Sequence, residues 1–184
     1  HALVNVLEPI FERRFIYDSY ACRTGKGTHA ELDRFQSFCG RYRYVLQCDI
    51  EKFFPTMDHE ILMGRICRVV KDPNVIWLCR LIIDHSNPQE PVDARFPGDD
   101  LFTPWERRRG LPIGNQTSQF FANVYLDPLD HFVKETLRCR GFVRYVDDFL
   151  LCSDDRRLLG EWKKRIAKFL ACLRLRLHPA KCEV

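Results

Sequence analysis

Two adjacent acidic residues, Asp147 and Asp148, interrupt an apolar run that extends from Phe142 to Leu151. The flanking residues are mostly β-branched or aromatic, which favours a strand on each side of the pair. One interpretation is an ordinary turn, because Asp is common in turns. Tight hairpin turns usually contain glycine, however, and residues 142–151 contain none. The segment therefore predicts two strands that meet at a pair of carboxylates.

A third acid, Asp49, ends another strand-like segment, Tyr44–Ile50, in the same way. Neighbouring carboxylates raise each other's pKa values, and a divalent cation removes that penalty. Three carboxylates at strand ends suit a site for two metal ions about 3.5–4 Å apart, which stabilises a phosphoryl displacement. Mg²⁺ prefers such all-oxygen sites. The residues alone thus favour metal-dependent phosphoryl transfer over an accidental acidic turn.

Capping residues mark the helices in the first half of the chain. Asp58 is positioned to begin one helix, and Asp72-Pro73 to begin a second. The second helix, over 75–83, is apolar on almost all sides and is predicted to be buried. Residues 86–109 contain several prolines among many charges, which predicts a long loop with a functional role.

The second half of the chain contributes two further helices. Helical periodicity starts at Ser118, and Pro128 is expected to kink or restart that helix. An amphipathic helix over 158–173 precedes an alternating segment, 174–177, that predicts a strand. This order predicts an α+β fold in which helices cover one face of an antiparallel sheet.

Composition excludes several classes of protein. Apolar residues make up 46% of the 184, so the chain can bury a core, and no apolar run is long enough to span a bilayer. The nine cysteines are an odd number at scattered positions, which predicts free thiols in a reducing cytoplasm. The net charge is only +4, although residues 153–184 hold nine Lys or Arg against four acids. This basic segment, with Lys163, Lys164, Arg165 and Lys168 on one helix, is compatible with an anionic partner or with an ordinary solvated face.

Several motifs resemble those of reverse transcriptases. Tyr145-Val146-Asp147-Asp148 resembles the Y-x-D-D box of that family. Four more segments resemble family motifs in the expected order: 17–29 (the fingers motif of the group II intron-like branch), 49–54 (the first aspartate box), 110–119 (the middle box) and 178–181 (the late lysine). The chain is therefore identified as a member of that branch.

The middle box departs from the common pattern. Ile113 stands where most members have Gln, and Gln119 where most have Pro. This form resembles the reverse transcriptases of diversity-generating retroelements, which copy RNA with frequent errors at adenine. An aliphatic side chain in place of an amide makes fewer directional contacts, which fits low fidelity.

The resemblance implies roles for individual residues. Asp49, Asp147 and Asp148 would bind two Mg²⁺ ions together with the backbone carbonyl of Ile50, with Mn²⁺ as a substitute. Lys181 would protonate the leaving pyrophosphate, unless it is simply an exposed lysine near the end of the chain.

The remaining expected roles concern substrates. Phe54 would act as the steric gate against ribonucleotides, while Arg23 and Lys26 would bind the dNTP triphosphate, unless they are merely exposed loop charges. The nascent base pair would contact Ile113, Gly114 and Ser118. Nucleic acid would contact Arg107, Arg108, Arg109 and Tyr145.

The family also implies a right-hand polymerase with fingers at 1–40 and 72–109 and a palm at 41–71 and 110–184. The palm would be a split βαβ sheet, and the thumb is expected to be absent. The expected partners are an RNA template, a DNA or RNA primer, dNTP and an accessory protein subunit, without a membrane, in a bacterial or phage-encoded cytoplasmic enzyme. Alternatives are a retron, abortive-infection or group II intron type reverse transcriptase, or a catalytically idle palm that only binds nucleic acid.

Overall fold

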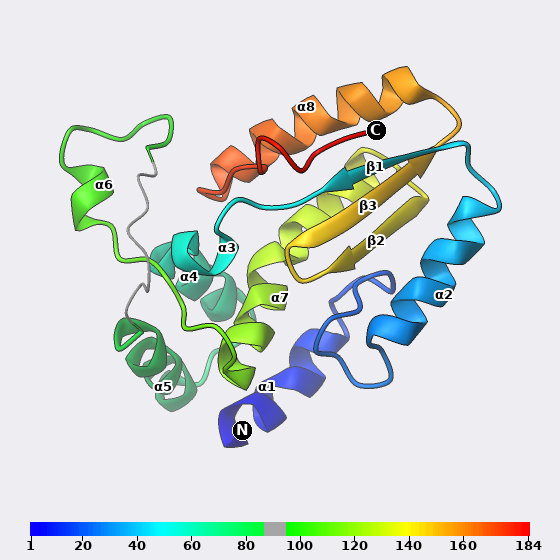
Figure 1. The fold of residues 1–184 in the computed structure, drawn as a ribbon. Coiled ribbons are helices and arrows are strands. Elements are labelled where there is room, and N and C mark those ends of the chain that lie inside the picture. The colour runs from blue at the N-terminus through cyan, green and yellow to red at the C-terminus, as the bar shows by residue number, and fades with distance from the viewer. Residues whose placement is uncertain (87–94) are drawn as a thin grey trace. The chain divides into compact units, whose positions relative to one another are not determined.

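The computed structural model describes residues 1–86 and 95–184 (Figure 1). The chain forms two compact units. The first consists of His1–Arg14, Lys52–Tyr125 and Ala171–Leu175, and the second of Phe15–Glu51, Leu126–Leu170 and Arg176–Val184. These units are defined by internal contacts and do not identify fingers or palm, so the expected lobe boundaries stay a prediction.

The second unit is built on a small antiparallel sheet (Figure 1). Its strands are β1 (Tyr44–Cys48), β2 (Gly141–Tyr145) and β3 (Asp148–Ser153), in the order β1-β3-β2. Tyr145 pairs with Asp148, and Cys48 pairs with Phe149. The predicted hairpin is thus confirmed, and the register brings the end of β1 beside the hairpin turn.

Helices cover both faces of this sheet. On one face, Phe38 of α2 (Thr28–Cys39) packs with Val143 and Cys152. On the other, η1 (Phe132–Thr136) places Lys134 over the ring of Phe142, and α8 (Arg156–Cys172) runs along the sheet (Figure 1). The α+β fold is confirmed, but the expectation of helices on one face only misses α2. That helix carries few apolar residues at regular spacing, and it packs through the aromatic side chains it does have.

The first unit is helical. It contains α1 (Ala2–Glu12), α3 (Phe53–Thr56), α4 (His59–Val69), α5 (Pro73–Asp84), α6 (Thr103–Glu106) and the beginning of α7 (Gln116–His131). Asp58 caps α4 and Asp72 caps α5, each by accepting two backbone N–H bonds, as predicted. Aromatic contacts hold the core, including Phe53 against Tyr125 and Phe11 against Phe120.

The structure corrects the prediction that the second helix is deeply buried. In α5 only Cys79 and Ile83 are buried, whereas Trp77 is 62% exposed. Helix α5 packs against α4 through one side. An apolar composition therefore did not translate into burial, because composition does not show how many neighbours surround a helix.

Three further local predictions need correction. Pro128 lies inside a continuous α7, which passes into the π-helix η1, so the helix does not restart there and the expected kink stays a prediction. Residues 174–177 form no strand; Leu177 makes an isolated bridge with Ile50. The predicted loop over 86–109 contains the short helix α6, and its residues 87–94 lie outside the described part.

Candidate active site

The turn of the β2–β3 hairpin and the end of β1 bring the predicted carboxylates into one region of the second unit. The turn contains only Val146 and Asp147, because Tyr145 already pairs with Asp148. Val146 adopts a φ of +54°, which is rare for a β-branched residue. Asp49 follows β1 directly and is almost buried.

Repulsion between the carboxylates is visible in their pKa values. Burial raises the pKa of Asp147 above its usual range, and the charges of Asp148 and Asp49 raise it further. Burial and the charge of Asp49 likewise raise the pKa of Asp148. The negative charge of Asp49 therefore disfavours ionisation of both carboxyls of the hairpin, which places the three groups in one electrostatic environment.

The C-terminal segment brings a cation to Asp49. His178 N donates to Asp49 O at 2.8 Å, and Glu51 N donates to Arg176 O at 2.9 Å, so the two segments run side by side. Lys181 Nζ then lies 2.5 Å from Asp49 Oδ2. This contact raises the pKa of Lys181, which keeps its ammonium charged. The predicted residues Asp49 and Lys181 thus meet directly.

The donor chemistry of this region fits a divalent cation. Mutually repelling carboxylates are the ligands that Mg²⁺ prefers, and binding of the ion would relieve their repulsion. Among the described residues, no three His, Cys, Asp or Glu side chains are already arranged around a common metal position. One oxygen of Asp49 is instead paired with Lys181. Metal binding would therefore require that carboxylate to exchange the ammonium for the ion.

Two residues near the carboxylates were missed by the sequence analysis. Glu31 of α2 has a raised pKa, caused by burial and by the charge of Asp148, so a fourth carboxylate lies near the hairpin. Arg144 is completely buried and ion-paired with Asp130. Its signal in the sequence was an arginine inside an otherwise apolar strand, which is tolerated only with a buried partner.

The predicted triphosphate-binding residues lie in the loop before α2, within the same unit. Arg23 Nη1 donates to the carbonyls of Ile16 and Ser19 at 2.6 and 2.7 Å. Lys26 Nζ donates to Tyr17 O at 2.9 Å and lies over the Tyr17 ring. Lys26 also lines a cleft of about 340 Å³. Both cations thus bind main-chain carbonyls here, and a triphosphate would have to replace those contacts.

Tyr145, expected to contact nucleic acid, links the hairpin to α2. Its hydroxyl accepts a hydrogen bond from Thr28 Oγ1 at 3.3 Å, and its ring packs in the cluster around Phe38. The tyrosine is therefore half-buried between β2 and the start of α2.

The other predicted dNTP contacts lie in the first unit. Leu111 N donates to Phe54 O at 3.0 Å, which ties the middle box to α3 and the predicted gate residue. Ile113 is 64% exposed, and Gly114 has a φ of +94° that favours glycine. Ser118 is buried. The box thus presents an aliphatic side chain and a glycine to solvent and keeps its serine inside.

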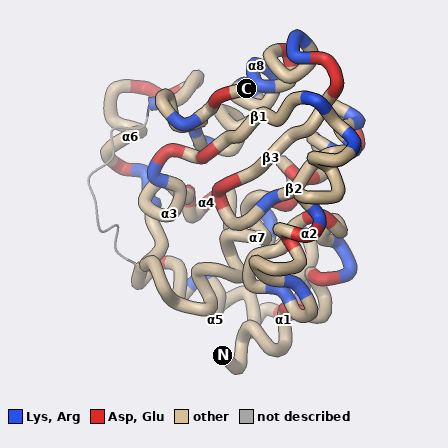
Figure 2. The backbone as a smooth tube through the Cα atoms, turned by 45° about the vertical axis from the view of Figure 1, so that its right-hand side comes forward, with Lys and Arg blue, Asp and Glu red and all other residues tan. Residues whose placement is uncertain are grey.

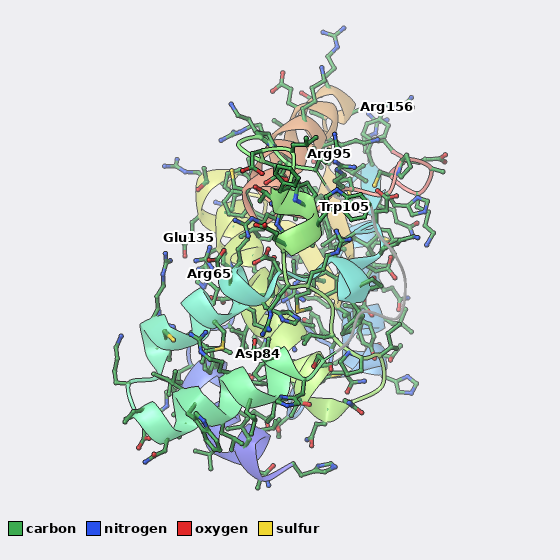
Figure 3. All side chains as sticks on the ribbon, turned by 90° about the vertical axis from the view of Figure 1, so that its left-hand side faces the viewer. Arg65, Asp84, Arg95, Trp105, Glu135 and Arg156 are labelled. Carbon is green, nitrogen blue, oxygen red and sulfur yellow. The ribbon has the colours of Figure 1, made fainter. Side chains whose placement is uncertain are left out.

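The three consecutive arginines have different environments. Arg107 is only 4% exposed and forms ion pairs with Asp99 and Asp58. Arg108 is exposed, and its guanidinium lies 3.3 Å from Asp84. Asp84 ends α5 and is labelled in Figure 3. Arg109 is half-buried. Of the three, only Arg108 presents its charge freely enough for a nucleic-acid contact without rearrangement.

Basic residues recur along α8 (Figure 2). Lys164, Arg165 and Lys168 are exposed, whereas Lys163 Nζ donates to Cys182 O at 2.6 Å and helps to fix the C-terminal segment.

Within the described ranges, none of the helices combines the length and the apolar character of a membrane span.

Comparisons with known proteins identify a family and similar relatives. The family model described as "Reverse transcriptase (RNA-dependent DNA polymerase)" matches residues 1–184. Nuclear intron maturase 1 of Arabidopsis thaliana is 30% identical, over 89% of this chain and 27% of its own length. The group II intron-encoded protein LtrA of Lactococcus lactis is 28% identical, over 70% of this chain and 20% of its own.

A solved structure agrees with these relatives. Apo telomerase from Candida tropicalis superposes with a TM-score of 0.67 at 14% identity, covering 99% of this chain and 35% of that one. The chain thus has the fold of a polymerase fingers and palm, and it spans about a third or less of these proteins. With its carboxylates gathered at the ends of paired strands and a family match over its whole length, the chain belongs to the reverse transcriptase family.

Proposed function

We propose that this chain carries the catalytic centre of an RNA-directed DNA polymerase. The observation that carries the proposal is the electrostatic coupling of Asp49, Asp147 and Asp148 at one end of the sheet. A protein does not gain stability by crowding carboxylates at the end of a sheet, where the negative charge of Asp49 raises the pKa values of Asp147 and Asp148, so the arrangement points to a ligand of positive charge. Membership of the reverse transcriptase family supports Mg²⁺ as that ligand and nucleotidyl transfer as the reaction.

In the proposed reaction the primer 3′-hydroxyl gives up its proton to solvent and its oxygen attacks the α-phosphorus of a dNTP, while the bond from that phosphorus to the oxygen of the β-phosphate breaks to release pyrophosphate. Two Mg²⁺ ions, held by the three carboxylates and the carbonyl of Ile50, would supply charge stabilisation for the attacking and leaving oxygens. Lys181, released from Asp49 when a metal takes that carboxylate, would give its proton to the leaving pyrophosphate.

We assign the selection of substrates to the residues for which the family resemblance implies such contacts. Arg23 and Lys26 would bind the triphosphate, and Phe54 would exclude a 2′-hydroxyl. Ile113, Gly114 and Ser118 would contact the nascent pair, and Arg108 and Tyr145 the template and primer. The proposed partners are accordingly an RNA template, a primer strand and dNTP.

Primer extension tests the proposal. Extension of a primer on an RNA template with Mg²⁺ and dNTP should fall at least about 10³-fold in Asp147→Ala, because the variant lacks a proposed metal ligand. Glu161→Gln removes an exposed carboxylate on α8 and serves as the matched control, with unchanged extension. Extension that survives in Asp147→Ala would refute the assignment of the site. Template–primer binding without any extension by the parent chain would favour an idle nucleic-acid-binding palm.

We further propose that the enzyme is error-prone and of the diversity-generating retroelement type. The support is the departure at Ile113, whose side chain is largely exposed and makes no directional contact of its own. Ile113→Gln should lower misincorporation opposite template adenine relative to the other three template bases. Equal error spectra in the parent and the variant would contradict this subtype. The similarity to intron maturases favours a group II intron type enzyme in that case.

A further inference from the structure

The turn that carries Asp147 is held in a strained conformation. Val146 has a φ of +54°, a region that β-branched residues rarely occupy. With only two residues between Tyr145 and Asp148, the turn has no spare residue to absorb the strain. Such a conformation persists only where the surrounding structure enforces it.

Arg144 supplies that enforcement from the strand before the turn. Its Nη1 donates to Val146 O at 2.9 Å. Its Nε and Nη2 donate to the two carboxylate oxygens of Asp130, each at 2.6 Å, and Nη2 also donates to Ser19 Oγ at 3.0 Å. The side chains of Arg144 and Asp130 have no exposed surface. Asp130 thus holds Nε and Nη2 of the guanidinium, and Nη1 of the same guanidinium holds the turn.

A role in stability alone explains this arrangement poorly. Burying two charges carries a large desolvation cost, and apolar residues of similar volume often give equal or higher stability. The planar, forked guanidinium can hold a carboxylate with two nitrogens and still donate in a third direction, which an ammonium or an apolar group cannot do. The third direction here is the carbonyl that precedes Asp147.

We propose that Arg144 is a positioning residue for the hairpin: anchored by Asp130, it holds the Val146 carbonyl and thereby fixes the orientation of the Asp147 and Asp148 carboxylates. The inference rests on the proposed function for the use of those carboxylates in catalysis. Their mutual repulsion would otherwise push a two-residue turn away from the orientation that a metal requires. The clamp made by Ser19, Asp130 and Arg144 opposes that relaxation.

The test needs variants that keep the fold. Arg144→Met alone would leave the Asp130 charge buried and unpaired, which destabilises strongly. The variant that combines Ser19→Ala, Asp130→Leu and Arg144→Met removes all polar members of the clamp together and should fold, as far-UV circular dichroism can show. Arg144→Lys keeps the charge opposite Asp130 and is the second variant. Arg34→Met, which removes a different arginine–aspartate pair in the same unit, is the matched control.

Amide hydrogen exchange in the full chain measures the clamp without requiring activity. In both clamp variants, exchange at residues 146–149 should accelerate about tenfold or more relative to 150–152 of β3, because the turn opens locally. Arg34→Met should leave both segments unchanged. Unaltered exchange at 146–149 in a folded clamp variant would overturn the inference. This readout does not depend on polymerase activity. An inactive parent chain would therefore refute the proposed function, while the amide exchange rates would still decide whether Arg144 holds the turn.

Kinetics then connect the clamp to chemistry. Displacement of the carboxylates should lower kcat about 100-fold and raise the Mg²⁺ concentration needed for half-maximal rate. The Kd for template–primer should not change. Val146→Gly removes the strain at the turn. The ratio of kcat with this substitution to kcat without it should therefore be higher in the clamp-free variant than in the parent chain. Equal ratios in the two backgrounds would show that Arg144 and the turn are uncoupled, against the proposal.

Discussion

Asp58 is the residue whose substitution should test the packing of the first unit most directly. Its side chain is completely buried. One oxygen caps α4 by accepting bonds from Glu60 N and Ile61 N at 2.9 and 3.0 Å. The other oxygen lies 2.6 Å from Arg174 Nη1 and 3.4 Å from Arg107 Nε.

The two oxygens make separable contributions. Loss of the helix cap should cost about 1 kcal/mol. Loss of a buried ion-pair partner typically costs about 3–5 kcal/mol. Here the lower end applies, because Arg107 keeps Asp99 and Arg174 keeps the exposed Glu60. Asp58→Ala should therefore lower the free energy of unfolding by about 4 kcal/mol.

Urea unfolding followed by far-UV circular dichroism measures this loss, and two variants separate its parts. Asp58→Asn keeps an oxygen for the cap and should lose about 3 kcal/mol. Asp72→Ala removes a comparable cap from α5, where the aspartate is exposed, and should lose about 1 kcal/mol. If Asp58→Ala costs no more than Asp72→Ala, the buried ion pairs contribute nothing and the reasoning fails.

Three further predictions concern the second unit. Lys181→Ala removes the ammonium that competes for the neighbouring carboxylate, so Mn²⁺ should bind several-fold more tightly in an electron paramagnetic resonance titration; weaker binding would contradict the competition. Burial and neighbouring charge raise the pKa values of Asp147 and Asp148, so their ionisation costs folding free energy at neutral pH. The Asp147→Asn/Asp148→Asn variant should therefore unfold at a higher Tm than the parent at pH 7 in EDTA. This gain should shrink as the pH falls through the raised pKa values and disappear below about pH 3, where the carboxyls are protonated in both states. Gly141→Ala would place its Cβ 2.8 Å from the Cys152 Cβ and should cost about 2 kcal/mol, visible as a lower Tm.

Features that depend on a few neighbouring residues could be predicted from the sequence. The caps at Asp58 and Asp72 follow from side chains that bond backbone groups two and three residues ahead. The β2–β3 hairpin follows from the apolar, strand-forming residues on both sides of the Asp147-Asp148 pair, although the turn itself lies at Val146 and Asp147. Both rules act within a few positions, so the rest of the fold cannot easily override them.

Features that depend on distant residues could not be predicted. The partner of Asp58 at Arg174 is 116 positions away. Asp49 and Lys181 are 132 positions apart, and they were placed in one site only by the family resemblance, since no local pattern indicates their contact. Arg107 was expected at a nucleic-acid surface because it is charged, yet two aspartates bury it. Periodicity and charge describe one segment at a time, whereas burial is a property of the assembled unit.

The candidate site itself is the place where local rules are broken together. A β-branched residue adopts a positive φ, acidic residues end apolar strands, and an arginine is buried beneath the turn. Each of these features alone would be a cost to folding, and each is tolerated through the others: the arginine holds the strained carbonyl, and Lys181 partly balances the carboxylates. Natural sequences keep such conflicts mainly where function requires them. The hairpin would therefore be the first candidate for a functional site even without any known relative, because no other described segment of the second unit combines strain, buried charge and uncompensated repulsion.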